Sequence, residues 1–252
     1  MSNGGKPAPA FAGSLLLTCP AQAEAREASI KIEDLSSPDA EHSTGLILRW
    51  RGQLLFAVEP ARRWRQATPG ASASVVFAHL IGIGGHVEPG ESWGEAVLRE
   101  AREEAGLTVS LAACGTTYLF SDDGAVSDIS ARLDWPDGPR PWFIWSMFPG
   151  FEPTPQVRLR HLLTAVFAAV VPDDVEPHPG SEVPAIIAVS EAHVRRAVGQ
   201  PACLGELMAD GARIWESTTV PRSALLVPAG SAYWYAMLLA KHASYGQQRE
   251  GS

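Results

Sequence analysis

Three glutamates, Glu100, Glu103 and Glu104, stand within one short stretch of the chain. On a helix, at 100° per residue, their side chains fall within a sector of roughly 100° on one face. Carboxylates this close repel one another, and cations offset that repulsion. Hard oxygen ligands on a short arc suit Mg²⁺ or Mn²⁺, which keep several waters and commonly bridge to substrate phosphates. The spacing predicts a divalent-cation site, with a solvated acidic face as the alternative.

A loop, a helix and a second loop are the elements that would position these acids. Ser92 and Glu95 form a capping box, which predicts that the helix begins there, and Gly106 suits the left-handed residue that ends it. Ahead of the helix, residues 84–90 predict a tight loop whose glycine backbone can approach a metal or a phosphate closely. Apolar residues at four-residue spacing predict the buried face of the helix: Val97, Ala101 and Ala105, with Leu98 beside them.

The segment from Gly85 to Leu107 resembles the Nudix box, G-x5-E-x7-R-E-U-x-E-E-x-G-U, in which U is an apolar residue. Every fixed position is matched, although Ala101 is smaller than the apolar residue that is usual at its position. With glycine usage near ~7% and each charged residue near ~6%, a chance match is on the order of one in a million. The resemblance implies hydrolysis of a diphosphate in a nucleoside diphosphate linked to another moiety, with Mg²⁺ or Mn²⁺ as cofactor.

The same resemblance assigns roles to the residues of the box. The implied metal ligands lie on the loop and the helix: Glu100, Glu103, Glu104 and the carbonyl of Gly85. Arg99 precedes Glu103 by one helical turn and would orient its carboxylate by a charge-assisted hydrogen bond. Glu91 would brace the loop against the helix, and Gly106 would complete the structural part of the box. Arg99, Glu100 and Glu103 are therefore the box residues expected to take part in catalysis.

The general base is open between a glutamate of the box and one on a later loop. Glu176 and Glu182 lie in a Pro/Gly-rich loop, residues 176–182, directly after the strand-like segment 162–171. Loops at strand ends carry functional sites more often than cores do. Glu182 is the preferred candidate, and an ordinary exposed acid is the alternative for either residue.

Candidates for substrate binding lie in and outside the glycine loop. His86 could contact a phosphate, or it could only hydrogen-bond to the backbone. Arg63 and Trp64 lie in the basic run 62–65 and could hold a phosphate and stack on a base, with a solvated basic loop as the competing account. No motif identifies the substrate, because selectivity lies in loops outside the box. We expect the aromatic-rich insertion, residues 121–156, to set it.

Composition argues against several classes of protein. The chain has 252 residues, of which 46% are hydrophobic, enough for one large core or two modest ones. It contains no apolar run near 18 residues and no convincing cleavage site, so we expect neither a membrane span nor a signal peptide. Three widely spaced cysteines fit neither a disulfide framework nor a zinc site and favour the cytoplasm. A net charge of −8 argues against general nucleic-acid binding, though not against a nucleotide held through cations.

Strand-like segments before and after the acidic helix, with further helices near the C-terminus, predict an α/β fold of mixed strand direction. The resemblance implies a Nudix-type α-β-α sandwich with a mixed β-sheet, plus an inserted segment and terminal extensions. Arg51-Gly52 is typical of a hairpin turn. The expected strands are residues 11–18, 44–50, 53–58, 73–83, 107–112, 116–120, 142–148 and 162–171, and the expected later helices are residues 190–198 and 234–242.

These elements suggest one domain rather than two. Residues 1–10 are expected to form a disordered tail, and residues 11–252 a single domain with its core at about 44–200. The insertion is expected at about 121–156 and a helical C-terminal extension at about 201–245. Many Nudix proteins form homodimers, and the resemblance therefore implies that this chain forms one as well.

Two classes of function follow from the resemblance. The first is a metal-dependent diphosphate hydrolase that acts on a small-molecule nucleotide or another diphosphate. The second is a catalytically inactive module that keeps the Nudix fold and binds a nucleotide. An inactive module should lose its carboxylates first, since idle acids cost stability without a cation. Every expected acid is present, so the hydrolase is the favoured interpretation.

Overall fold

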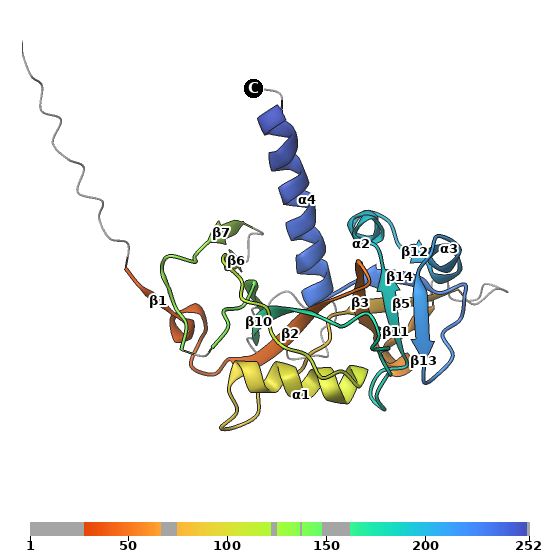
Figure 1. Ribbon diagram of the computed structural model, residues 1–252, viewed down its shortest axis with the longest axis horizontal. Coiled ribbons are helices and arrows are strands. Elements are labelled where there is room, and N and C mark those ends of the chain that lie inside the picture. The colour runs from red at the N-terminus through yellow and green to blue at the C-terminus, as the bar shows by residue number, and fades with distance from the viewer. Residues whose placement is uncertain (1–27, 67–74, 122–124, 137, 148–161, 251–252) are drawn as a thin grey trace, which may run out of the picture.

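The structure is a computed structural model that describes residues 28–66, 75–121, 125–136, 138–147 and 162–250. The predicted tail, residues 1–10, and the predicted strand at residues 11–18 lie outside the described residues. Figure 1 shows helix α1 on one side of a β-sheet and the other helices on the opposite side, the layered α/β architecture that the sequence predicts. The helices are α1 (Trp93–Ala105), α2 (Glu191–Ala197), α3 (Leu204–Ala209) and α4 (Ser231–Glu250), with short 3₁₀ helices at Ile32–Leu35 and Ala61–Arg63.

The strands form one large mixed sheet and one small sheet. They are β1 (Ile30–Lys31), β2 (Glu41–Trp50), β3 (Gln53–Val58), β4 (Arg65–Gln66), β5 (Val76–Ile81), β6 (Tyr118–Phe120), β7 (Val126–Asp128), β8 (Leu133–Asp134), β9 (Phe143–Met147), β10 (Leu162–Val170), β11 (Ala185–Val189), β12 (Ala202–Cys203), β13 (Arg213–Glu216) and β14 (Leu225–Pro228). The main order of the large sheet is β12-β14-β5-β3-β2-β10-β9-β6-β7. In addition, β11 pairs with β3 and β13, and β4 pairs with β5, whereas β1 and β8 form the small sheet.

The hairpin predicted at Arg51-Gly52 is confirmed. β2 and β3 pair in antiparallel fashion, with Trp50 opposite Gln53. Arg51 and Gly52 both have positive φ, 47° and 75°, as a two-residue type I′ turn requires. The turn therefore fixes the register of the two strands that begin the sheet. β2 starts earlier than predicted, at Glu41.

Strand β10 lies in the middle of the sheet, as its apolar run predicts. It pairs in parallel with β2 from Leu162 opposite Glu41 to Val170 opposite Arg49, and it pairs in antiparallel fashion with β9. Every residue from Leu163 to Phe167 is buried. A strand covered on both faces has no exposed side that would require polar residues, which explains its continuous apolar sequence.

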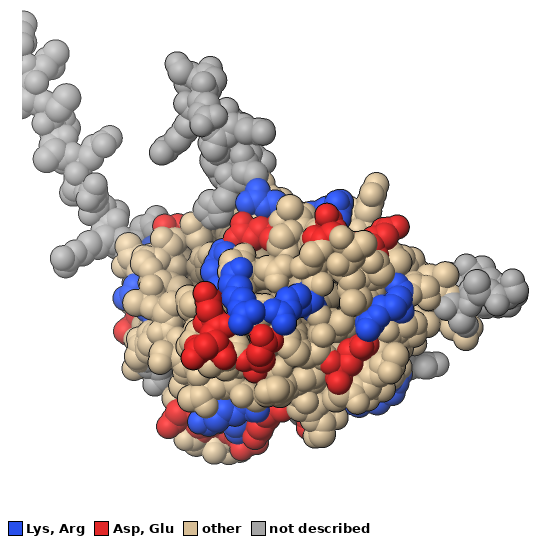
Figure 2. Space-filling view, turned by 45° about the vertical axis from the view of Figure 1, so that its right-hand side comes forward, with Lys and Arg blue, Asp and Glu red and all other residues tan. Residues whose placement is uncertain are grey.

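One face of the molecule mixes positive and negative side chains (Figure 2). On the face drawn in Figure 2, Lys and Arg side chains lie beside Asp and Glu side chains. Described ion pairs include Arg222 with Glu216, whose nearest atoms are 2.8 Å apart, and Arg49 with Glu191. None of the helices in the described part of the chain combines the length and the hydropathy that a membrane-spanning helix needs.

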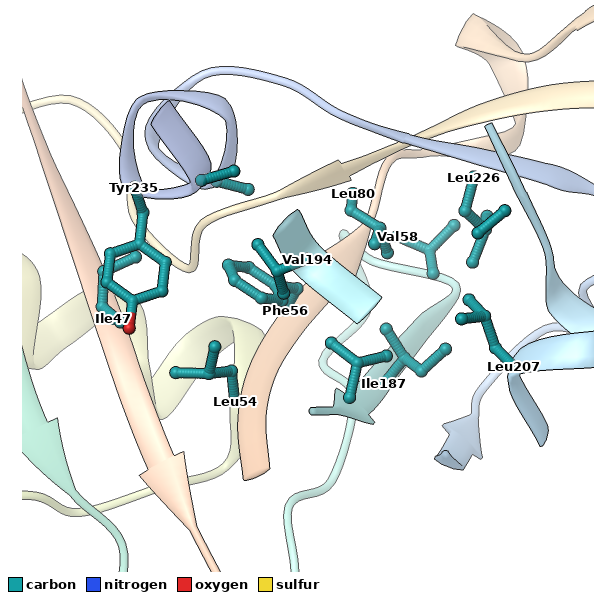
Figure 3. Close-up of a cluster of buried hydrophobic side chains, with 14 of the residues drawn as sticks. Ile47, Leu54, Phe56, Val58, Leu80, Ile187, Val194, Leu207, Leu226 and Tyr235 are labelled. Carbon is teal, nitrogen blue, oxygen red and sulfur yellow. The ribbon is translucent and has the colours of Figure 1, made fainter. Parts of the chain in front are cut away.

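Each face of the sheet carries one hydrophobic cluster. On the α1 face, Val97, Ala101 and Ala105 are fully buried against the sheet, which confirms the stripe predicted from their spacing. On the opposite face, Val194 of α2 and Tyr235 of α4 join a second cluster, and both are labelled among the members that Figure 3 draws. The sheet is thus the middle layer. Within the described chain, α1 is the only α-helix that contributes to the cluster on the α1 face.

The strand predicted at residues 107–112 is wrong. Within this segment only Leu111 makes a β-bridge, to Ala169, although Leu107 is fully buried in the α1-face cluster. Gly106 turns the chain away from the helix, and the residues that follow insert apolar side chains into the core without pairing along a neighbouring strand. Burial without a hydrogen-bonded ladder produces the same apolar spacing as a strand.

The C-terminal extension is not only helical, which corrects the prediction for about residues 201–245. β14 pairs in parallel with β5, from Leu225 opposite Phe77 to Pro228 opposite Leu80, and β13 pairs with β11. The extension therefore widens the sheet. Its strands have two to four residues each, too few for a clear alternating pattern. Helix α4 is longer than predicted, because it begins at Ser231 and reaches Glu250.

Candidate active site

The glycine loop brings the backbone against α1 and β2. Gly84 has φ 152°, and a Cβ atom at this position would overlap the carbonyl oxygen of Thr44. A Cβ atom on Gly85 would overlap the carboxylate of Glu100. The Thr44 N–H donates to the Gly85 carbonyl at 2.8 Å, which fixes the loop to the first residues of the sheet. At Gly84 both the positive φ and the close approach of the backbone favour glycine, whereas at Gly85 a side chain would have to displace the carboxylate of Glu100.

Local signals set both ends of α1 as predicted. The Ser92 hydroxyl accepts from the Glu95 N–H, and the Glu95 carboxylate accepts from the Ser92 N–H at 2.9 Å, completing the capping box. Gly106 has φ 65°, the left-handed conformation expected of a residue that ends a helix. The first and last residues of the helix are thus determined by residues that belong to the box or adjoin it.

Arg99 is the centre of the hydrogen-bond network of the loop and the helix. Its guanidinium donates to both carboxylate oxygens of Glu91, at 3.0 and 3.1 Å, and to the carbonyl of His86 at 2.9 Å. It also donates to Glu100 at 2.8 Å and to Glu103 at 3.0 Å. Arg99 lowers the pKa of Glu91 through these hydrogen bonds. The fork geometry of arginine allows one side chain to serve four partners.

Of the predicted metal ligands, Glu104 is buried and Glu100 is half-buried. Burial raises the pKa of Glu104 to about 7, and the charges of Glu100, Glu182 and Glu103 add to the shift, whereas a hydrogen bond from the Gly84 N–H opposes it. That hydrogen bond is 2.9 Å long. Burial also raises the pKa of Glu100, and Arg99 partly offsets this effect. Glu103 differs, because 59% of its side chain is exposed.

The loop from residue 176 to residue 182 lies against the C-terminal end of α1. The Gly180 N–H donates to the carbonyl of Glu104 at 2.9 Å, and the His178 N–H donates to the carbonyl of Ala105 at 2.8 Å. A Cβ atom on Gly180 would overlap the carbonyl of Glu103. The loop thereby brings the charge of Glu182 close enough to raise the pKa of Glu100 and Glu104.

Glu176, the other acid of this loop, is directed elsewhere. Its carboxylate accepts from the indole N–H of Trp215 at 2.9 Å and forms ion pairs with Arg51 at 3.4 Å and Arg213 at 3.6 Å. Glu182 is therefore the acid of the loop that faces the box. Trp215 and Arg213 were not among the predicted site residues, because the four residues of β13 show no alternating pattern; only the strand-favouring Ile214 and Trp215 indicate a strand there.

The predicted substrate-binding residues lie in two separate places. His86 adjoins the acids, has 69% of its side chain exposed and contacts Glu41 at 3.2 Å. Trp64 packs against the hydrophobic cluster on the face opposite α1, and its indole N–H donates to the Glu59 carbonyl at 2.8 Å. Arg63 lies in the adjoining 3₁₀ helix. The structure thus joins the backbone of His86 to the box through Arg99, whereas the ring of Trp64 packs on the opposite face of the sheet.

Comparisons with known proteins identify the family. Residues 44–203, more than half of the chain, match the family model described as the NUDIX domain. A NUDIX family hydrolase from Clostridium perfringens has a TM-score of 0.38 and 17% identity, over 62% of this chain and 85% of that one. A MutT protein from Methanosarcina mazei Go1 has a TM-score of 0.35 and 18% identity, over 63% and 83% of the two chains. Curated proteins gave no match. By the family match, the chain belongs to the NUDIX domain family and is a hydrolase of the Nudix class.

Proposed function

We propose that this chain hydrolyses the diphosphate linkage of a nucleoside diphosphate linked to another moiety, and that it requires Mg²⁺ or Mn²⁺. The observation that carries the proposal is one buried acid, Glu104, and one half-buried acid, Glu100, beside two others. Glu104 is only 8% exposed and the Glu100 side chain 13%, while Glu103 and Glu182 add negative charge nearby. Burial and repulsion both oppose ionisation of these carboxylates. A divalent cation would relieve both, and membership of the Nudix family supports the same chemistry.

The donor atoms suit a hard divalent cation. The carboxylates of Glu100, Glu103 and Glu104 and the carbonyl of Gly85 would hold it. Across the described ranges, no three His, Cys, Asp or Glu side chains are already gathered as a ligand set. Binding would therefore require the acids to rotate towards a common point, and the exposed Glu103 has room to do so. The bound cation would polarise the diphosphate oxygens and lower the pKa of a bound water.

The remaining groups would position the reactants and move a proton. Glu182 would act as the general base, accepting the proton of the attacking water, since it faces the acids and is exposed to solvent. Arg99 would hold Glu103 and Glu100 in orientation through the hydrogen bonds that it already makes. His86, exposed on the loop, would donate to a phosphate oxygen. Each of these roles can be separated by substitution.

Three further expectations remain part of this proposal. A net charge of −8 supports a small-molecule substrate over general nucleic-acid binding. The small number of cysteines, three in the chain, supports a cytoplasmic location. The habit of the family supports a homodimer, which sedimentation of the purified protein would test.

The proposal is tested by phosphate release from a panel of nucleotides and nucleoside diphosphate conjugates, with Mg²⁺ or Mn²⁺. We expect hydrolysis by the wild type, and a loss in Glu103→Gln and Glu104→Gln that exceeds the roughly 10- to 100-fold cost of removing an outer-shell partner of a metal. Glu206→Gln, at an exposed position of α3, is the matched control and should keep wild-type activity. Unchanged rates in both box variants would discredit the assignment of these ligands. Binding of the same compounds without turnover by the wild type would instead indicate an inactive nucleotide-binding module.

A further inference from the structure

The connection between β10 and β11 is attached to the rest of the protein at two separate places. Its first part lies against the end of the β2–β3 hairpin. The Arg51 guanidinium donates to the carbonyl of Asp173, with the Nε contact at 2.8 Å, and the Trp50 indole N–H donates to the carbonyl of Val175 at 2.7 Å. Its second part lies against the end of α1 through His178 and Gly180. Glu182 follows directly, so its place depends on both attachments.

Glu176 lies between the two attachments and is held by a layered arrangement of rings and guanidinium groups. The guanidinium of Arg51 stacks over Trp50 at 4.3 Å, and that of Arg213 lies 4.9 Å from the same ring. Trp215 meets Trp50 edge to face, with ring centroids 5.1 Å apart. We call these four residues, Trp50, Arg51, Arg213 and Trp215, the loop clamp. Both arginines and the Trp215 N–H are directed at the carboxylate of Glu176.

These contacts together constrain the loop more than a single exposed ion pair would. Trp50 is 1% exposed, so the stack has a rigid base. The carboxylate of Glu176 accepts one hydrogen bond, from Trp215, and forms ion pairs with both arginines, so contacts from three side chains restrict its rotation. On the α1 side, the loop N–H groups satisfy carbonyls of the last helical turn that have no partner within the helix. Displacement of the loop would therefore break hydrogen bonds at both ends.

We propose that Glu176 and the loop clamp are positioning residues, which hold Glu182 at the acids of the box. Two clamp residues, Arg213 and Trp215, belong to β13, so the C-terminal extension contributes to the site through a strand that pairs with β11. This inference rests on the proposed function, because it assigns the clamp to the service of Glu182 as general base. It also explains why the two acids of one loop face in different directions.

The test is a double-mutant cycle between the clamp and Glu182. Trp215→Phe removes the indole N–H but keeps an aromatic ring over Trp50. We expect it to lower kcat by about 10-fold, with KM nearly unchanged, in the otherwise wild-type chain. In the Glu182→Gln background the same substitution should change kcat by less than about 2-fold, because the base that the clamp positions is already absent. Glu216→Gln, on the same strand, removes a carboxylate that pairs with Arg222 and is the matched control.

Hydrogen exchange gives a second measurement that does not depend on turnover. The amides of His178 and Gly180 are bonded to the end of α1, so Trp215→Phe should reduce their protection while Glu216→Gln should not. Equal losses of kcat in both backgrounds, or unchanged protection of the two amides, would overturn the inference. If Glu182→Gln retained wild-type activity, the inference would also fail, whereas metal-dependent hydrolysis by the wild type would leave the proposed function standing. If no substrate were turned over, the proposed function would fail and the inference, which rests on it, would fail with it.

Discussion

Arg99 shows how much of the site depends on a single side chain. It joins the loop to the helix through Glu91 and the His86 carbonyl, and it restrains Glu100 and Glu103 at the same time. A lysine could reach one of these partners, but its ammonium group cannot reproduce the planar fork. The role that the box pattern implies for Arg99, orienting Glu103, is thus part of a wider arrangement.

We predict that Arg99→Lys lowers kcat/KM by about 10- to 100-fold, the cost typical of losing a group that orients metal ligands. Arg102→Lys, at an exposed position of the same helix, makes the same chemical change outside this network and should have little effect. Steady-state kinetics with Mg²⁺, together with the Tm of each variant, would provide the measurement. Equal kinetics for the two variants would contradict the role of Arg99.

The pKa of Glu104 has a consequence for stability in the absence of metal. Because burial raises this pKa from 4.5 to about 7, the folded state binds more protons than the unfolded chain between these pH values. The free energy of unfolding should therefore fall as pH rises from about 4.5 to about 7, by at most about 1.4 kcal/mol per pH unit from this group. We predict that Glu104→Gln reduces the fall, since an amide does not ionise. Thermal unfolding in EDTA across this pH range measures the fall in stability. Equal slopes of the free energy of unfolding against pH in the variant and the wild type would refute the prediction.

At the scale of elements, the glycine loop places two adjacent residues under different constraints. At Gly84 the obstacle to a side chain is the backbone of Thr44, and φ is positive as well. At Gly85 the obstacle is the end of the flexible Glu100 side chain. Backbone cannot move aside cheaply, whereas a carboxylate can rotate away. The same substitution should therefore affect stability at one position and chemistry at the other.

We predict that Gly84→Ala lowers the free energy of unfolding by more than about 1 kcal/mol, as expected for a strained backbone conformation. Gly85→Ala should lower it less and should reduce kcat, because Glu100 is displaced from Arg99 and from the proposed cation. Gly52→Ala, at a turn with open space around it, provides a reference for positive φ without a clash. Denaturant unfolding and kinetics on the three variants would test this, and a greater stability loss at Gly85 would contradict it.

At the scale of the whole molecule, segments before, within and after the predicted core contribute strands outside the box. The small sheet joins the N-terminal segment to the insertion, with Ile30 opposite Leu133 and Lys31 opposite Asp134. In the large sheet, β14 pairs with β5 and continues the strand order beyond it. The division into a core at about 44–200, an insertion and an extension remains a prediction, although the match to the NUDIX domain family covers residues 44–203.

The accuracy of the sequence predictions follows the range of the interactions. The ends of α1 and the hairpin were predictable because Ser92, Gly106 and Gly52 determine conformation through neighbours a few residues away. The place of Glu182 and the contacts of Trp215 depend on residues more than thirty positions away, such as Trp50 and Glu104, so no local pattern reports them. The packing of Trp64 likewise depends on distant residues, because its ring lies against the hydrophobic cluster on the face opposite α1.

The central claim is that the acids of α1 hold a divalent cation. The most direct test is calorimetric titration with Mn²⁺ after treatment with EDTA. The proteins compared are the wild type, Glu103→Gln, Glu104→Gln and the control Glu206→Gln. We predict saturable binding by the wild type and the control, and binding weakened by at least about 10-fold in both box variants. Binding of equal strength in all four proteins, or none by the wild type even with a nucleotide present, would contradict the account.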